Sequence, residues 1–443
     1  MKRLKQLLVL LLIPAILLAL SACGTESRPT VPSDPNVPAT TAPVESPDPT
    51  DGSDPTQPIV QGTDLAGQWV KPNAEQGSHF AFSDEGFYYI SGVLRFMDTA
   101  NGASVPLCYK AGCKHDDGDC EAGIGYANVF FCWDGHVYFD KRIREDPNGI
   151  HLFRRNADGT GEEKVATLAE EYYSQKNSVG VAQYIVADGM LYCVASIIET
   201  VEMSPNEFSS REQGTMILRL DLRTRKQETL VRYDNTYIAL LGARDNALLF
   251  YTQETPSSED IFAPDYSERL QALPARLNVW TESSGKAVAL FEKPNKECPW
   301  ICGLMGSTIL YTDYTNQYAY DLGTGTHSTV NIPSLYIIVN DNYLLDQSPR
   351  PEDMLQGVYT KFWDIRTGKH IPSDFDDADI YLRSISEKGC IIDIHYIKEM
   401  EPSGGGYILH TSREIRAYVP FAAMEDGLQE SDLLVISDEK KDI

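Results

Sequence analysis

The feature that most constrains the fold is a hairpin motif that recurs along most of the chain. An apolar segment is followed by a short turn of Asp, Asn or Gly, and then by a second segment rich in aromatic and β-branched residues. Such turns join antiparallel strands because Asp, Asn and Gly tolerate a positive φ. Seven copies of the motif occur, at 82–90, 132–139, 186–193, 243–250, 304–311, 339–345 and 386–393.

A second kind of turn follows most copies and completes a repeating unit. Two hairpins per repeat give four antiparallel strands, and units of about 40–50 residues built in this way are typical of β-propellers. The sequence therefore predicts an all-β fold, a β-propeller of seven blades, with six or eight as the alternatives. Ring closure is assigned to 433–436, or to 65–70 returning to the last blade. The second turns lie in 152–159, 217–224, 279–285, 318–325 and 362–368.

The order of the turns predicts which face of the propeller carries the long connections. If the strands of a blade are named a to d outward from the axis, the a–b and c–d turns lie on one face. The b–c and d–a connections then lie on the other face, and all of the large insertions belong to this second set. Insertions on one face of a repeat array commonly mark the binding face. They are 196–215, 252–275, 346–357 and 398–406 in b–c connections, and 108–125 in a d–a connection.

The N-terminus carries a strong signal that concerns export. Lys2, Arg3 and Lys5 precede fourteen mostly apolar residues, 7–20. This segment is shorter than the roughly 20 residues of a membrane-spanning helix. A positive segment followed by a short apolar core is typical of a secretory signal peptide, which is therefore predicted for residues 1–22.

The end of this signal peptide resembles the lipobox of bacterial lipoproteins, in which small residues precede a cysteine. Leu20-Ser-Ala-Cys23 has this form. The resemblance implies that Cys23 becomes the first residue of the mature protein and carries a diacylglyceryl group. Two acyl chains anchor a protein stably. The expected location is the extracytoplasmic face of the cell membrane, with the membrane as a partner through the lipid on Cys23.

Residues 23–63 are predicted to be a disordered tether between this anchor and the folded part. The segment 24–63 holds nine of the 25 prolines of the chain and no aromatic residue. Such a composition buries too little apolar area to offset the entropy lost on ordering. The predicted organisation is thus a signal peptide at 1–22, a lipidated tether at 23–63 and a β-propeller at 64–443.

The lipobox, the tether rich in Pro, Thr, Ser and Asp, and the Tyr-rich hairpin repeats together resemble a known group of proteins. These are uncharacterised lipoproteins of Gram-positive bacteria whose β-propeller is similar to that of the Tol translocation system and to WD-type propellers. The similarity is architectural and covers nearly the whole mature chain. Because propellers include binding proteins, scaffolds and enzymes, the resemblance implies a fold and a location but no activity.

One segment concentrates potential metal ligands. Two of its three cysteines are first predicted to close the loop as a disulfide, as in many exported proteins. Three thiols and an imidazole can instead form a tetrahedral zinc site, although the spacing differs from that of common zinc motifs, and free thiols are the third alternative. Asp116, Asp117 and Asp119 make calcium a further option. The main prediction is that the protein has no cofactor. The candidate residues are Cys108, Cys113, His115 and Cys120.

The remaining cysteines divide into two sets. Cys298 and Cys302 frame a short segment and are a second candidate pair for a disulfide. Cys132, Cys193 and Cys390 fall in expected strands, where a thiol behaves as a small apolar core residue.

The sequence favours binding over catalysis. The 64 acidic and 38 basic residues give a net charge of −26, which argues against a nucleic-acid partner because phosphate binding needs positive surface. No nucleophile elbow, zinc-protease motif, phosphate loop or dinucleotide fingerprint occurs, so no catalytic residue is predicted. Tyr266, Trp300 and Tyr314 are candidates for stacking on sugars, with ordinary packing as the other interpretation.

The predicted function is that of a membrane-anchored extracytoplasmic propeller without catalytic activity. It binds a glycan, peptide or protein on the face that carries the b–c and d–a connections. One alternative is an extracytoplasmic hydrolase or lyase whose carboxylates converge at the propeller axis. A second alternative is a scaffold for envelope assembly.

Overall fold

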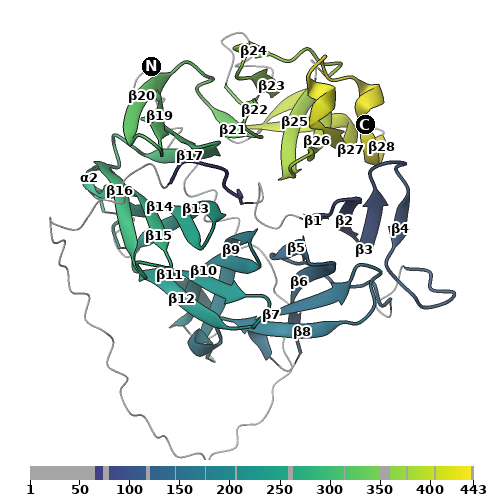
Figure 1. The fold of residues 1–443 in the computed structure, drawn as a ribbon, viewed down its shortest axis with the longest axis horizontal. Helices are drawn as coiled ribbons and strands as arrows, with labels where there is room; N and C mark the ends of the chain where they lie inside the picture. The colour runs from purple at the N-terminus through teal and green to yellow at the C-terminus, as the bar shows by residue number, and fades with distance from the viewer. Residues whose placement is uncertain are drawn as a thin grey trace, which may run out of the picture. The chain divides into compact units, whose positions relative to one another are not determined.

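The fold is a ring of seven β-sheets. In the part of the chain that the structure describes, twenty-eight strands form seven four-stranded antiparallel sheets, which surround a central axis as the blades of a β-propeller (Figure 1). The predicted seven-bladed propeller is confirmed. No described helix is both long and apolar enough to span a membrane. The computed structural model describes residues 65–72, 79–115, 120–144, 146–174, 176–204, 207–257, 263–313, 315–348, 360–375, 378–403 and 406–440.

Each blade consists of four strands that are consecutive in the chain. Blade 1 contains β1 (Phe80–Phe82), β2 (Gly86–Ser91), β3 (Val93–Asp98) and β4 (Ser104–Pro106). Blade 2 contains β5 (Phe130–Trp133), β6 (His136–Ile143), β7 (Asp146–Asn156) and β8 (Glu163–Leu168). Blade 3 contains β9 (Asn177–Ala187), β10 (Met190–Ser204), β11 (Glu207–Asp221) and β12 (Gln227–Tyr233). Blade 4 contains β13 (Thr236–Arg244), β14 (Ala247–Glu254), β15 (Pro274–Thr281) and β16 (Ala287–Pro294).

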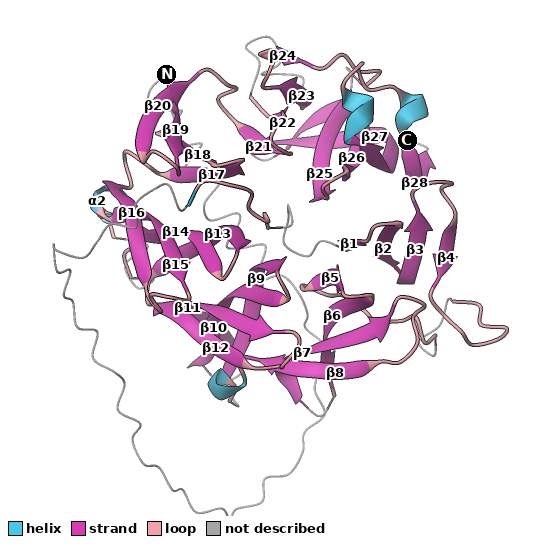
Figure 2. Ribbon diagram, viewed as in Figure 1, coloured by secondary structure: helices cyan, strands magenta, loops and turns pink. Residues whose placement is uncertain are grey.

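The last three blades follow the same order. Blade 5 contains β17 (Trp300–Met305), β18 (Thr308–Thr312), β19 (Gln317–Asp321) and β20 (Thr326–Val330). Blade 6 contains β21 (Tyr336–Ile338), β22 (Tyr343–Asp346), β23 (Lys361–Asp364) and β24 (Lys369–His370). Blade 7 contains β25 (Ala378–Ile385), β26 (Gly389–Ser403), β27 (Gly406–Pro420) and β28 (Leu434–Lys440). A short helix, α2 (Tyr266–Ala272), lies between β14 and β15 (Figure 2).

The first strand of each blade lies nearest the axis and the fourth lies at the outside (Figure 1). The seven hairpin motifs of the sequence are the a–b hairpins of the seven blades. Their turns have the backbone that the sequence predicts, since Asp134, Asp188 and Asn246 adopt φ values of 49°, 53° and 60°. Local turn chemistry therefore sets the repeat.

The hydrophobic core lies between neighbouring blades, because the inner strands bury both of their faces. In β14, Leu248 and Phe250 pack against blade 3, whereas Leu249 and Tyr251 pack toward blade 5. These four side chains are at most 1% exposed. Successive side chains of a strand point to opposite faces, so a strand between two blades is apolar at every position. The described residues form seven such clusters, one at each interface between blades.

The ring closes through packing rather than through a shared sheet. Leu434 and Ile436 of β28 pack against the cluster of blades 7 and 1, so the prediction for 433–436 holds. The alternative prediction for 65–70 is wrong. Val70 pairs with Ala243 of β13, and Trp69 is buried between blades 4 and 5. Because blade 7 builds all four strands from its own residues, it needs no strand from the N-terminal side.

Two of the predicted insertions are strands rather than loops. The segment 196–215 continues the ladder of β10 and β11 as far as Ser204 opposite Glu207. The described residues of the segment 398–406 likewise lie within β26 and β27, as far as Ser403 opposite Gly406. These hairpin ends lack the apolar alternation of a buried strand, so the sequence pattern does not mark them. Both hairpins still join the second and third strands of a blade, as expected for the face that carries the b–c and d–a connections. Residues 349–359, with most of the insertion at 346–357, lie outside the described residues.

Candidate functional site

The segment between β4 and β5 is fixed at the junction of blades 1 and 2. The Leu94 N–H donates a hydrogen bond to the Ala122 carbonyl at 2.8 Å, and Arg155 Nη1 donates to the Glu121 carbonyl at 2.6 Å. Ala122 and Ile124 are buried in the hydrophobic cluster between the two blades. The described residues of this segment are therefore held in place although they form no strand.

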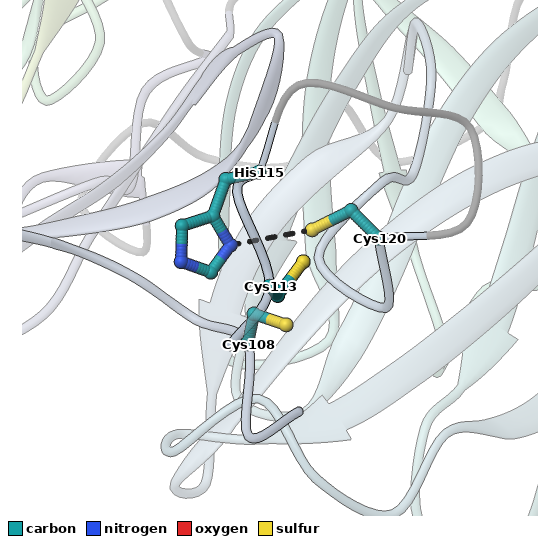
Figure 3. Close-up of side chains that lie close together, drawn as sticks. All are labelled: Cys108, Cys113, His115 and Cys120. Carbon is teal, nitrogen blue, oxygen red and sulfur yellow. Dashed lines mark hydrogen bonds between the residues drawn. The ribbon is translucent and has the colours of Figure 1, made fainter. Parts of the chain in front are cut away.

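The four predicted ligands of this segment converge (Figure 3). Their three Sγ atoms and one imidazole nitrogen all lie within 4.8 Å of one another. The distance from Cys120 Sγ to His115 Nδ1 is 3.5 Å. Cys120 is buried, and Cys108, Cys113 and His115 are half-buried. Within the described part of the chain, no other group of three or more His, Cys, Asp or Glu side chains gathers in this way.

Two local features of the backbone bring these side chains together. The Cys113 N–H donates to the Lys110 carbonyl at 3.2 Å, which closes a turn and brings Cys113 back toward Cys108. His115 has a φ of 61°, in the left-handed region that residues other than glycine seldom adopt. This conformation turns the chain again before Cys120.

The thiols of the group influence one another electrostatically. Partial burial opposes ionisation of Cys108, but hydrogen bonds from the backbone N–H of Lys110, from the other two thiols and from the N–H of Glu121 outweigh it, so the pKa of Cys108 is lowered. At Cys113 the N–H of His115 favours the thiolate, but burial and the neighbouring sulfurs prevail and raise the pKa to about 11. One thiolate in the group thus disfavours a second because like charges repel.

The other cysteines lie elsewhere in the fold. Cys298 belongs to the cluster between blades 4 and 5, whereas Cys302 packs against the cluster between blades 5 and 6. The two thiols therefore pack into different clusters. Cys193 and Cys390 are buried core residues, as predicted, and Cys132 is half-buried.

All eight cysteines in the described part of the chain have free thiols. The predicted disulfide within Cys108, Cys113 and Cys120 and the predicted pair of Cys298 and Cys302 remain predictions. Several other predicted features lie outside the described residues. They are the signal peptide 1–22, Cys23, the tether 23–63, Asp116, Asp117, Asp119 and Tyr314.

The face with the b–c and d–a connections carries a pair of exposed aromatic rings. Trp300, a sequence candidate, is 45% exposed, and Tyr237 is 46% exposed. Their rings are stacked, with centroids 6.4 Å apart and an interplanar angle of 24°. Tyr266 is half-buried on α2. Sequence reasoning missed Tyr237 because tyrosine also fills the buried strands of this repeat.

The two rings come from neighbouring blades. Tyr237 is the second residue of β13 and Trp300 is the first residue of β17. Both strands are the innermost of their blades, and both residues follow a d–a connection. Gln253 Nε2 donates to the Pro299 carbonyl at 3.4 Å, which ties the start of β17 to β14. The stacked pair therefore lies at the end of the ring where the long connections meet the inner strands.

A buried carboxyl group occupies the corresponding end of blade 7. Asp379 is the second residue of β25, opposite His395 in β26, and is 4% exposed. Its Oδ1 atom has no hydrogen-bond partner, and Oδ2 accepts a long hydrogen bond of 3.5 Å from the Tyr381 hydroxyl. Burial raises the pKa of Asp379 to about 6, although the Thr360 N–H and the Tyr381 hydroxyl partly oppose the shift. Nothing in the sequence distinguishes Asp379 from the acidic residues that precede it.

Comparison with known proteins gives this chain neither a family nor an activity. No protein-family model matches the chain, and no curated protein matches its sequence. Similar solved structures include a puromycin hydrolase with 11% identity and a TM-score of 0.46, over 87% of this chain and 57% of that one. An oligogalacturonate lyase in complex with manganese has 11% identity and a TM-score of 0.39, over 68% of this chain and 77% of that one. TolB from Acinetobacter baumannii has 12% identity and a TM-score of 0.33, over 72% and 75%.

The seven four-stranded sheets themselves define the class of fold, a β-propeller. The chain spans a little over half the length of the puromycin hydrolase structures, at 56% and 57%. The lipoprotein character and the Gram-positive origin remain predictions. Because one fold hosts many activities, function has to be argued from the site.

Proposed function

We propose that this protein is a lipid-anchored, extracytoplasmic β-propeller that binds a glycan on the face of its b–c and d–a connections, without transforming it. The single observation that carries the proposal is the exposed stacked pair of Tyr237 and Trp300 at the inner end of that face. The anchor rests on the lipobox-like segment that ends in Cys23.

Exposed paired aromatic rings suit carbohydrate recognition. Tyrosine and tryptophan combine an apolar ring with a polar tip, and they are enriched where a ligand offers both kinds of surface. A sugar ring offers apolar C–H groups on one face and hydroxyl groups at its edge. Because neighbouring strands position Tyr237 and Trp300, little side-chain entropy has to be lost on binding.

The charge of the chain favours a neutral ligand. A net charge of −26 repels polyanions over a distance set by the Debye length, which is about 8 Å at physiological ionic strength. We therefore expect neutral oligosaccharides to bind more tightly than oligosaccharides that contain uronic acids.

The first test is binding of neutral and uronate-containing oligosaccharides to the full chain, measured by isothermal titration calorimetry. An aromatic contact contributes about 0.5–1.5 kcal/mol, so Trp300→Ala and Tyr237→Ala should each weaken binding by roughly 2–12-fold. Trp300→Phe should retain most of the affinity. Tyr109→Ala is the matched control, because Tyr109 is 63% exposed but lies in the β4–β5 segment. Unchanged affinity in both alanine variants would refute the proposed site.

The anchor has a separate test. Cys23→Ala in the full chain should move the protein from the membrane fraction to the soluble fraction. Retention of this variant in membranes would contradict lipid anchoring through Cys23.

A hydrolase or lyase remains the second candidate function, because Asp379 has properties that a general acid needs. It is buried beside the innermost ring of strands, and its pKa is about 6. The test is turnover of whichever oligosaccharide binds, with Asp379→Asn as the variant. Turnover that is lost in this variant would replace the non-catalytic proposal. A protein captured independently of any sugar would instead favour the scaffold alternative.

A further inference from the structure

We propose that Cys108, Cys113, His115 and Cys120 bind one Zn²⁺ ion, which fixes the β4–β5 segment against blades 1 and 2. The proposal goes beyond glycan binding and does not depend on it. It concerns a different part of the ring from the stacked aromatic pair.

The geometry of the four side chains is close to that of a tetrahedral zinc site. Zn–S bonds of about 2.3 Å and Zn–N bonds of about 2.0–2.1 Å place neighbouring ligand atoms roughly 3.5–3.8 Å apart. The distance of 3.5 Å from Cys120 Sγ to His115 Nδ1 already agrees with this requirement. All four ligand atoms lie within 4.8 Å of one another, so small side-chain rotations bring the remaining pairs to the required distance.

A disulfide explains less of this arrangement than a metal ion does. One S–S bond uses two of the three sulfurs, and it gives no role to the third thiol or to the imidazole of His115. A single cation uses all four groups. Thiolate and imidazole are preferred zinc ligands, whereas calcium takes oxygen ligands, so the donor set selects zinc among the two metals considered.

The backbone next to the sulfurs is held by hydrogen bonds. The Cys113 N–H donates to the Lys110 carbonyl at 3.2 Å, and the Gly123 N–H donates to the Cys120 carbonyl at 2.8 Å. Hydrogen bonds around metal ligands help to hold the ligands in place.

The group also has an apolar side and an accessible side. Cys108 and Cys113 pack against the hydrophobic cluster of blades 1 and 2, to which Cys120 belongs. Lys114 is exposed, so one side of the group is open to solvent. A metal ion can therefore reach the ligands, and the bound ion would hold the β4–β5 segment against the core.

The test uses the full chain, purified after growth with zinc. Elemental analysis should find about one zinc per chain, and Co²⁺ exchange should give the absorption bands of tetrahedral cobalt with thiolate ligands. Cys113→Ser and His115→Ala should each reduce the bound zinc at least fivefold. Cys132→Ala and His136→Ala are matched controls, since they remove a thiol and an imidazole of blade 2 outside the group, and both should keep the metal.

Three outcomes would overturn the proposal. The first is zinc at background in the wild-type protein. The second is zinc that is unchanged in both ligand variants. The third concerns the number of reactive thiols in the protein denatured with a chelator. If this number is two lower than in the reduced protein, the protein contains a disulfide. If a variant does not fold, the cobalt spectrum and the thiol count of the wild-type protein still decide between metal and disulfide.

Discussion

Replacing Trp69 tests whether the segment before the first blade is part of the folded core. This segment, 65–72, belongs to no blade, yet Trp69 is only 5% exposed. The indole Nε1 donates to the Leu65 carbonyl at 3.2 Å, and the guanidinium carbon of Arg244 lies 4.5 Å from the ring centroid. We expect Trp69→Ala to destabilise the propeller as a whole, because the indole fills the interface of blades 4 and 5.

The magnitude follows from the buried area. A buried aromatic side chain removes roughly 150–250 Å² from water. At about 25 cal/mol per Å², this area corresponds to about 4–6 kcal/mol. Measured costs of replacing core tryptophan or phenylalanine by alanine are about 3–5 kcal/mol, because the site partly collapses. We therefore expect a loss of about 3–5 kcal/mol in the free energy of unfolding.

Urea-induced unfolding followed by circular dichroism measures this loss. Val70→Ala is the matched control, since Val70 neighbours Trp69 but is 45% exposed, and surface changes cost about 0.5 kcal/mol or less. If Trp69→Ala lowered the free energy of unfolding no more than Val70→Ala, the segment 65–72 would make no contribution to the stability of the propeller. That result would refute its assignment to the core.

Two further predictions concern buried carboxylates. Burial raises the pKa of Asp379 from 3.8 to about 6, which favours the protonated form in the folded state, so wild-type stability falls as the pH rises from about 4 to above 6. Asp379→Asn should therefore be more stable than wild type by about 2–3 kcal/mol at pH 7.5 and by little near pH 4, and a difference independent of pH would contradict this. Asp393 accepts hydrogen bonds from Arg383 and Arg416 at 2.7 Å with its side chain 6% exposed, so Asp393→Ala should cost about 2–4 kcal/mol in urea unfolding. Asp438→Ala, at a more exposed ion pair, should cost less than about 1 kcal/mol, and equal losses would refute the role of burial.

The blades could be predicted because their determinants are local. The Asp-Gly turn at 134–135 and the apolar run at 248–251 specify a hairpin and a doubly buried strand within a few residues. The inner strand pairs join segments that follow one another in the chain, so no long-range information is needed. The extended hairpins at 196–215 and 398–406 escaped this reasoning, because the described residues of their outer parts pair with only one other strand.

The candidate sites depended on the tertiary structure to different degrees. The group at Cys108 was identified from residue types, but only the tertiary structure shows that its four ligand atoms converge. The four-residue spacing of Cys298 and Cys302 favoured a pair, yet β17 has a register irregularity between Ile301 and Gly303. Side chains two positions apart in a regular strand point to the same face of the sheet. A register irregularity interrupts this alternation, so the sequence spacing alone does not predict whether the two thiols lie on the same face.

By itself, the sequence determined the repeat, the number of blades and the content of the inner strands, since turn chemistry and side-chain alternation act over a few residues. Only the tertiary structure decided which distant residues meet. It stacked Tyr237 on Trp300 across two blades, and it placed Trp69 between blades 4 and 5. It also left the Asp379 carboxyl group buried. These contacts arise from how blades pack around the ring, and this packing is set by many weak apolar contacts that no short pattern records.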